Sequence, residues 1–140
     1  TYPDRMAAGM ALCGGCSLKD VSGLGKLPFW IIHGTADRAV PVKQSKVVVD
    51  KLKRDGNDSR LIYDWWQGAN HGMPARVFYM KKTYQWLFSH TLNDPDRPVN
   101  RDIDISMGDV RNAYDGVNRN APKPELIDGP SVIKNEGNEY

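Results

Sequence analysis

The chain has 140 residues, 40% of them hydrophobic, and its 19 Lys and Arg against 17 Asp and Glu give a formal net charge of +2. This length allows one ordinary domain at most, and no run of basic residues exceeds two, which argues against nucleic acid as a partner. No apolar stretch reaches the roughly 20 residues that cross a bilayer, and the N-terminus lacks the layout of a signal peptide. We therefore expect a soluble protein of undetermined compartment, with secretion or the periplasm left open.

Two apolar runs predict the first strands. Residues 6–15, MAAGMALCGG, and residues 28–34, PFWIIHG, are typical of central parallel strands that are buried on both faces. Cys13 and Cys16 form a C-x-x-C pair, which fits either a redox dithiol or two small residues at a strand end. The glycine-rich segment that follows favours the second interpretation, because a redox pair stands at a helix N-terminus.

The elements that follow alternate between helix and strand. Residues 41–56 predict an amphipathic helix with Pro in its first turn, and residues 60–66, RLIYDWW, alternate as a strand near a sheet edge does. Residues 75–90 predict a second helix, and His90 near its C-terminal end is placed to interact favourably with the helix dipole. The face of this helix that we expect to lie on the sheet is formed by Val77, Met80, Tyr84, Leu87 and Phe88.

The last part of the chain differs from the rest. Residues 1–90 carry a net charge of +6, whereas residues 91–140 carry −4 and are rich in Pro, Asn, Asp and Gly. This contrast predicts a folded unit over residues 1–92 and an irregular polar tail over residues 93–140, with one short strand through Ile103 and Ile105.

Asp37 and His71 each follow a predicted parallel strand, where functional groups of α/β proteins gather. A carboxylate bound to His Nδ1 leaves Nε2 free to take a proton from a hydroxyl, so the two residues fit the acid and base of a catalytic triad. Two plainer interpretations stay open. Asp37 fits a turn or helix cap, and His71, which has glycines on both sides, fits a structural loop residue.

The span from Tyr2 to about His90 resembles the C-terminal part of an α/β-hydrolase of the esterase and predicted-peptidase type. This group includes phospholipase/carboxylesterase-like, dienelactone-hydrolase-like and feruloyl-esterase-like proteins. The matching pieces, in order, are YPDRMAAGMALCGG, LPFWIIHGTADRAVPVKQS, GANHGM and TYQWLFSH. The resemblance implies about three parallel strands with flanking helices, Asp37 as the triad acid and His71 as the base.

In this fold the nucleophilic Ser precedes the acid and the His in the chain, within a G-x-S-x-G turn. The resemblance therefore implies that the Ser, the oxyanion hole and the N-terminal part of the same domain lie upstream of Thr1, and that this chain alone is inactive. Ser17, in GCSLK, is an internal candidate, but the residues after it contain two glycines where the helix after the nucleophile belongs. Ser45 is less suitable because it lies within the predicted helix.

Three residues around the His71 loop are candidates for substrate binding. Trp65 and Trp66 stand where the family has a more usual Tyr-Pro-like pair, and with Met73 they fit either the lining of a pocket or core packing. Asn70 replaces a usual Gly, and Asn also tolerates left-handed backbone conformations.

Three histidines without a pair at i, i+4, and no second cysteine pair, predict no metal, and no cofactor is implied. The sequence thus predicts part of a serine hydrolase that cleaves small-molecule carboxylic esters, or small peptides, through an acyl-enzyme. The alternative is a non-catalytic α/β binding module or a degenerate hydrolase.

Overall fold

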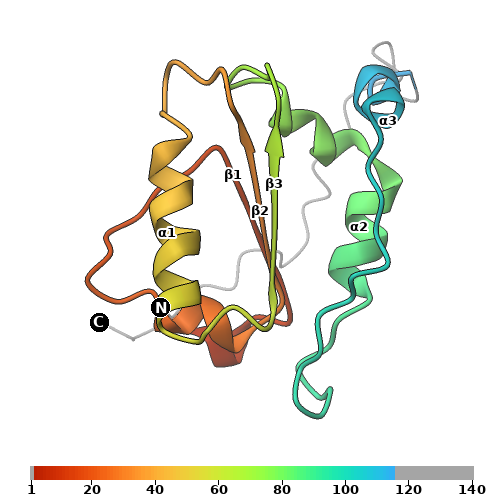
Figure 1. The fold of residues 1–140 in the computed structure, drawn as a ribbon. Coiled ribbons are helices and arrows are strands. Elements are labelled where there is room, and N and C mark those ends of the chain that lie inside the picture. The colour runs from red at the N-terminus through yellow and green to blue at the C-terminus, as the bar shows by residue number, and fades with distance from the viewer. Residues whose placement is uncertain (1, 116–140) are drawn as a thin grey trace, which may run out of the picture.

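The computed structural model describes residues 2–115, which form a parallel sheet with helices on both faces (Figure 1). The strands lie in the order β1-β2-β3 and are all parallel, with bounds β1 (Gly9–Leu12), β2 (Phe29–Gly34) and β3 (Leu61–Trp66). The helices are α1 (Lys43–Arg54), α2 (Lys81–Phe88) and α3 (Met107–Asn112). Short 3-10 helices span Pro3–Arg5, Ser22–Lys26 and Pro74–Tyr79.

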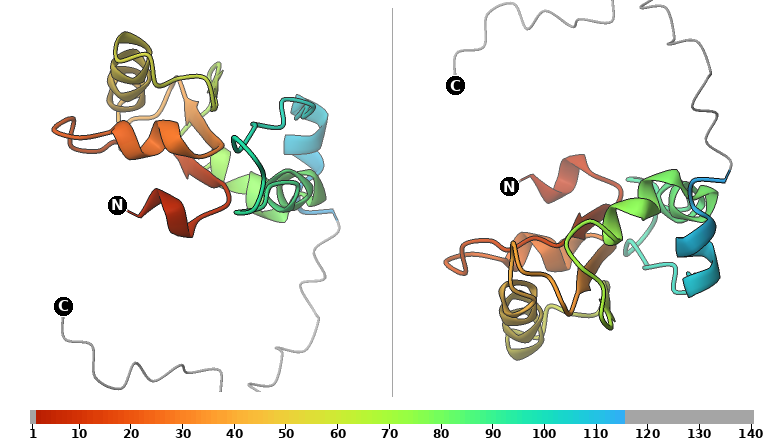
Figure 2. Two further views of the ribbon diagram at one scale, coloured as in Figure 1. Left: turned by 90° about the horizontal axis from the view of Figure 1, so that it is seen from below. Right: turned by 90° about the horizontal axis from the view of Figure 1, so that it is seen from above.

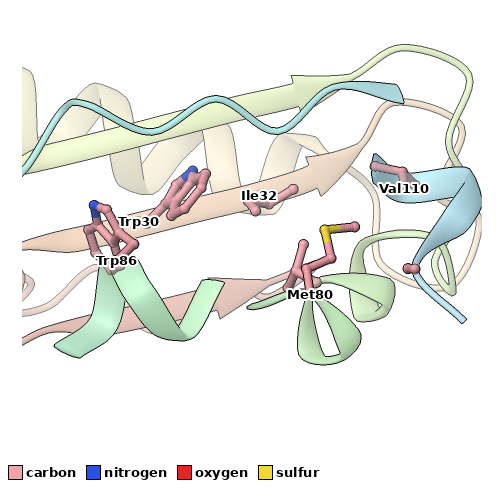
Figure 3. Packing of buried hydrophobic residues seen from close by; sticks show 7 residues of the cluster. Trp30, Ile32, Met80, Trp86 and Val110 are labelled. Carbon is pink, nitrogen blue, oxygen red and sulfur yellow. The ribbon is translucent and has the colours of Figure 1, made fainter. Parts of the chain in front are cut away.

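The sheet separates two hydrophobic clusters, because alternate residues of a strand point to opposite faces. Helix α1 covers one face, and α2 and α3 cover the other, as both views in Figure 2 show. The cluster under α1 contains Val21, Ile31, Val48, Val49, Leu52 and Leu61. The cluster on the opposite face, shown in Figure 3, contains Trp30, Ile32, Val77, Met80, Trp86, Val110 and Ala113.

Among the described residues, β1 is less buried than the central strand that its apolar sequence indicates. All four residues of β1 are half-buried, whereas β2 is buried from Trp30 to Gly34. The physical reason is position, since β2 has a strand on each side and β1 is hydrogen-bonded only to β2 among the described strands. β3 lies at the other edge of this sheet, as its alternating pattern predicts.

The helix predicted over residues 75–90 is divided at Met80, whose φ of −102° and ψ of 127° are extended. A 3-10 helix precedes this residue and α2 follows it, so the two segments present different faces to the sheet. Trp86 is buried, whereas the side chain of Phe88 is 80% exposed and Tyr84 is also exposed. The predicted sheet-facing side is therefore wrong for Tyr84 and Phe88.

His90 caps the end of α2 by hydrogen bonding. Its Nδ1 donates to the Trp86 carbonyl at 2.8 Å, and its Nε2 accepts from the Asn100 amide at 2.9 Å. One ring nitrogen donates and the other accepts, so the ring is the neutral Nδ1-protonated tautomer. His90 is thus a structural residue, and it stabilises the helix end with a hydrogen bond rather than a charge.

Residues 93–115 pack against the domain and contain helix α3. Arg101 donates to the Leu61 and Ser59 carbonyls at 3.1 and 2.9 Å, and Val110 is fully buried. The predicted strand through Ile103 and Ile105 is wrong, because this segment has no regular secondary structure. Residues 116–140 of the predicted tail lie outside the described residues, and the boundary at residue 93 stays a prediction.

Helix α3 begins with a capping box that the sequence analysis missed. The Asp109 amide donates to Ser106 Oγ at 3.1 Å, and Asp109 Oδ2 accepts from the Ser106 amide at 2.8 Å. Asp109 Oδ2 also binds Lys82 Nζ of α2 at 2.8 Å. The S-x-x-D spacing directly before an apolar residue is the signal that predicts such a helix start.

Acidification should loosen the contact between α2 and α3. The Lys82 hydrogen bond first, and those of Ser106 next, lower the pKa of Asp109 from 3.8 to about 2. A carboxyl whose pKa is lower in the folded state than in the unfolded state stabilises the fold at any pH above the unfolded-state pKa. This contribution is lost as pH falls from about 3.8 towards 2. NMR titration of the Asp109 carboxyl carbon tests this. Lys82→Ala should raise the midpoint, and an unchanged midpoint would contradict the assignment.

Candidate active site

The loop after β2 holds Asp37 in a fixed orientation. Its amide donates to the Gly34 carbonyl at 3.2 Å, which closes a tight turn directly after the strand. Its carboxylate Oδ1 accepts from the Ala39 and Val40 amides at 2.9 and 2.8 Å. The residue is only 7% exposed. The backbone of its own loop therefore aims the other oxygen, Oδ2, away from the turn.

The loop after β3 presents His71. Gly68 adopts φ +70°, a left-handed conformation that glycine takes without a steric penalty. Asn70 does not use the left-handed conformation that Asn tolerates; its side-chain Oδ1 accepts from the Gly72 and Met73 amides at 3.1 and 3.2 Å. This turn holds the backbone on both sides of His71.

Direct contacts join the two loops. The Thr35 amide donates to the Trp66 carbonyl at 2.9 Å, and Thr35 Oγ1 accepts from the Gly68 amide at 2.8 Å. The loops approach so closely that a Cβ on Gly34 would lie 2.2 Å from the Ala69 carbonyl oxygen. Only glycine fits at this position.

Asp37 and His71 are in contact, as the sequence analysis predicts. Asp37 Oδ2 lies 2.7 Å from His71 Nδ1, whose ring is half exposed. A hydrogen bond from Nδ1 to the carboxylate leaves Nε2 of the neutral ring as the proton acceptor. The arrangement has the geometry of an acid and base pair at an accessible edge of the sheet.

The Asp37 carboxylate is stabilised in its charged form. Burial is the largest single influence and raises its pKa, but hydrogen bonds from Val40, His71, Cys13 and Ala39 together outweigh burial and hold the pKa well below its usual range. Asp37 therefore stays ionised at neutral pH and keeps its ability to orient an imidazole.

Cys13 is a part of this cluster that the sequence analysis placed only at a strand end. It is buried, has an uncommon positive φ of 49°, and its thiol faces Asp37. Burial, together with the nearby carboxylate, raises the pKa of this thiol. Cys13 and Cys16 are both free, the latter exposed.

Atoms of Cys13, Asp37 and His71 lie within 4.8 Å of one another, which makes them a conceivable ligand set for a metal. The 2.7 Å between Asp37 Oδ2 and His71 Nδ1 is a hydrogen-bond distance. Two such ligands on a tetrahedral zinc would lie about 3.3 Å apart, given metal bonds of about 2.0–2.1 Å. A protonated, buried thiol is also a poor ligand, so the cluster fits hydrogen bonding rather than metal binding.

Comparison with known proteins gives the family. The sequence profile of the prolyl oligopeptidase family matches residues 18–94, which include both Asp37 and His71. The chain belongs to the prolyl oligopeptidase family. This membership confirms the resemblance to an α/β-hydrolase of the esterase and peptidase type. No curated protein matches the chain in sequence.

A solved structure supports the same fold for this family member. The crystal structure of a thermostable esterase matches with a TM-score of 0.56 and 27% sequence identity, over 64% of this chain and 25% of that chain. The chain thus spans about a quarter of the esterase. The predicted fold class, part of an α/β-hydrolase, is confirmed.

Ser17 and Ser45 differ sharply in their surroundings in this prolyl oligopeptidase family member. Ser45 is 3% exposed, and its Oγ lies 2.7 Å from His33 Nδ1 and 2.6 Å from the Gly14 carbonyl oxygen. Its hydroxyl is thus buried and already hydrogen-bonded within the protein. Ser17 is exposed, and its Oγ accepts only a long 3.4 Å bond from the Lys19 amide among the described contacts.

The predicted substrate-binding residues lie on both faces of the sheet. Trp65 packs beside Tyr63 on the α1 side, and its ring centroid lies 5.8 Å from Lys46 Nζ. Trp66 and Met73 instead pack against the cluster on the opposite face. Both tryptophans line a cavity of about 520 Å³ beside β3. Neither Asp37 nor His71 is among the described residues that line it.

No helix within residues 2–115 is long and apolar enough to span a membrane.

Gly34→Ala should separate the two loops of this family member. The new Cβ would overlap the Ala69 carbonyl, so we expect a loss of about 1–3 kcal/mol in the free energy of unfolding of the complete gene product. The downfield His71 Nδ1 proton signal should weaken because the bond to Asp37 lengthens. Gly14→Ala is the control, since its Cβ meets no atom closer than 3.9 Å. Equal behaviour of both variants would refute the close approach.

Proposed function

We propose that Asp37 and His71 are the acid and the general base of a Ser-His-Asp triad in a serine hydrolase. The observation that supports this most directly is the 2.7 Å contact between Asp37 Oδ2 and His71 Nδ1, at the carboxyl ends of adjacent parallel strands. Family membership and the esterase neighbour support a hydrolase that cleaves esters or peptides. Within that class we propose small-molecule carboxylic esters as the main substrates and small peptides as the lesser ones.

In the proposed mechanism His71 moves two protons. Its Nε2 takes the proton of the nucleophilic Ser as the hydroxyl attacks the ester carbonyl, and then gives it to the leaving alcohol as the acyl-enzyme forms. In deacylation Nε2 takes a proton from the attacking water molecule and gives it to the Ser oxygen as the acid product leaves. Asp37 keeps the ring in the Nδ1-protonated form and stabilises the imidazolium in each step.

We place the nucleophile and the oxyanion hole outside residues 1–140. This placement is supported by the chain order of the fold, in which Ser precedes the acid, and by the fraction of the esterase that the chain spans. Ser45 is an unsuitable nucleophile because its hydroxyl is buried and bound. For the substrate pocket we propose Met73, which follows the His71 turn, together with one of Trp65 and Trp66.

Asp37→Asn in the complete gene product should lower kcat by up to about 10⁴-fold, because a neutral amide can hold the wrong imidazole tautomer. KM should change little, since the ester itself does not touch Asp37. His71→Ala should cost as much or more. Hydrolysis of a p-nitrophenyl ester measures both effects, and Asp50→Asn, an exposed acid on α1, serves as the matched control. Near-normal turnover by either site variant would remove the triad assignment.

The nucleophile can be located chemically. A fluorophosphonate probe reacts with the activated Ser of a serine hydrolase, and peptide mapping then identifies the labelled residue. We expect the label on a G-x-S-x-G serine upstream of Thr1, no label on residues 1–140 expressed alone, and no label in His71→Ala. A labelled Ser17 would refute the proposed placement. An unlabelled and inactive gene product would favour the alternative of a non-catalytic module.

A further inference from the structure

His33 is a buried side chain in contact with the catalytic acid. It lies in β2, four residues before Asp37, and is 0% exposed. Its Nδ1 is 2.7 Å from Ser45 Oγ, and its Nε2 is 2.8 Å from the Val40 carbonyl and 3.2 Å from Asp37 Oδ2. Ser45 and Val40 are hydrogen-bond partners of the ring, and Asp37 lies at ion-pair distance.

The hydrogen atoms of this network can be assigned from its partners. The Gly14 carbonyl only accepts, so the single hydroxyl hydrogen of Ser45 points to it across 2.6 Å. Ser45 Oγ must then accept from His33, which places a hydrogen on Nδ1. The Val40 carbonyl also only accepts, which places a hydrogen on Nε2. A ring that donates from both nitrogens is an imidazolium cation.

A buried cation is stable only when an opposite charge lies beside it. The carboxylate of Asp37 provides this charge at 3.2 Å, and the described network offers His33 acceptors on both sides of its ring. Asp37 Oδ2 thus lies at ion-pair distance from His33 on the interior side and accepts a hydrogen bond from His71 at the half-exposed edge. The charge of one carboxylate is shared between two histidines.

We propose that His33 is a positioning residue that acts as a buried imidazolium: it fixes Asp37 in the orientation that receives His71 and withdraws part of the carboxylate's charge from His71. This inference rests on the proposed function, in which His71 is the general base. The groups that face the carboxylate from every surrounding segment are His33, His71, the Cys13 thiol and the amides of Ala39 and Val40. Among these described groups, His33 is the one to which the proposal assigns a positive charge.

The first test is NMR of the histidine side chains in the complete, selectively ¹⁵N-labelled gene product at pH 7 to 8. We expect both ring nitrogens of His33 to have the shift of a protonated nitrogen. His90 is a matched internal control, since it is also buried but has one donating and one accepting nitrogen. A bare nitrogen on His33 would overturn the proposal. The result does not depend on catalysis, so ester hydrolysis by the wild-type protein tests the proposed function separately.

The second test compares His33→Leu, which removes the donor, with His33→Gln, which keeps a neutral donor. His33→Leu should lower kcat about 10- to 100-fold, because the Asp37 carboxylate loses its charged neighbour, with KM little changed. His33→Gln should recover part of kcat.

The pH profile separates positioning from a purely structural role. The ring nitrogens of His33 and His71 lie no more than about 6 Å apart, because both contact Oδ2. Without the cation, the full charge of Asp37 favours protonated His71. The acid limb of the kcat profile should then move to higher pH by about 0.5 to 2 units in both His33 variants. His90→Gln should reduce stability without moving the acid limb of the kcat profile. An acid limb that does not move in a folded His33→Gln variant would refute the proposed role.

Discussion

The register between β2 and β3 is the constraint on which the site depends. The two strands are parallel and pair from Phe29 with Leu61 to Gly34 with Trp66, so they end level at one edge of the sheet. Their loops are then forced together, and the close approach is possible because Gly34 has no side chain. Asp37 and His71, 34 residues apart in sequence, meet as a consequence. A shift of one residue would turn every side chain of β3 to the other face and would displace His71 from Asp37.

Asp37 links this edge to the interior. Its Oδ1 is bound by the backbone of its own loop, and its Oδ2 contacts one exposed and one buried histidine. The buried histidine is in turn fixed by Ser45 of α1, which reaches the Gly14 carbonyl beyond β1. The carboxylate is therefore oriented by segments that follow all three strands. Such preorganisation removes the need to reorient the acid when charge develops on His71.

The sequence predicts the parts of this arrangement that depend on local pattern. Apolar runs indicate the strands, and the glycines and acid after them indicate the loops that carry Asp37 and His71. The role of His33 could not be predicted, because it depends on a helix residue and a carbonyl from distant segments that only the folded chain brings together. The break at Met80 was also not predictable from periodicity, since the apolar spacing continues through it while packing of Trp86 changes the face that is buried.

The central claim is that His71 serves a nucleophilic Ser from the position in which Asp37 holds it. A crystal structure of the complete gene product, covalently bound to a phosphonate ester inhibitor, tests this most directly. The account predicts His71 Nε2 within about 2.6–3.2 Å of the phosphonylated Ser oxygen while Nδ1 still contacts Asp37. A phosphonylated Ser whose oxygen lies far from His71, with an intact Asp37 contact, would contradict it.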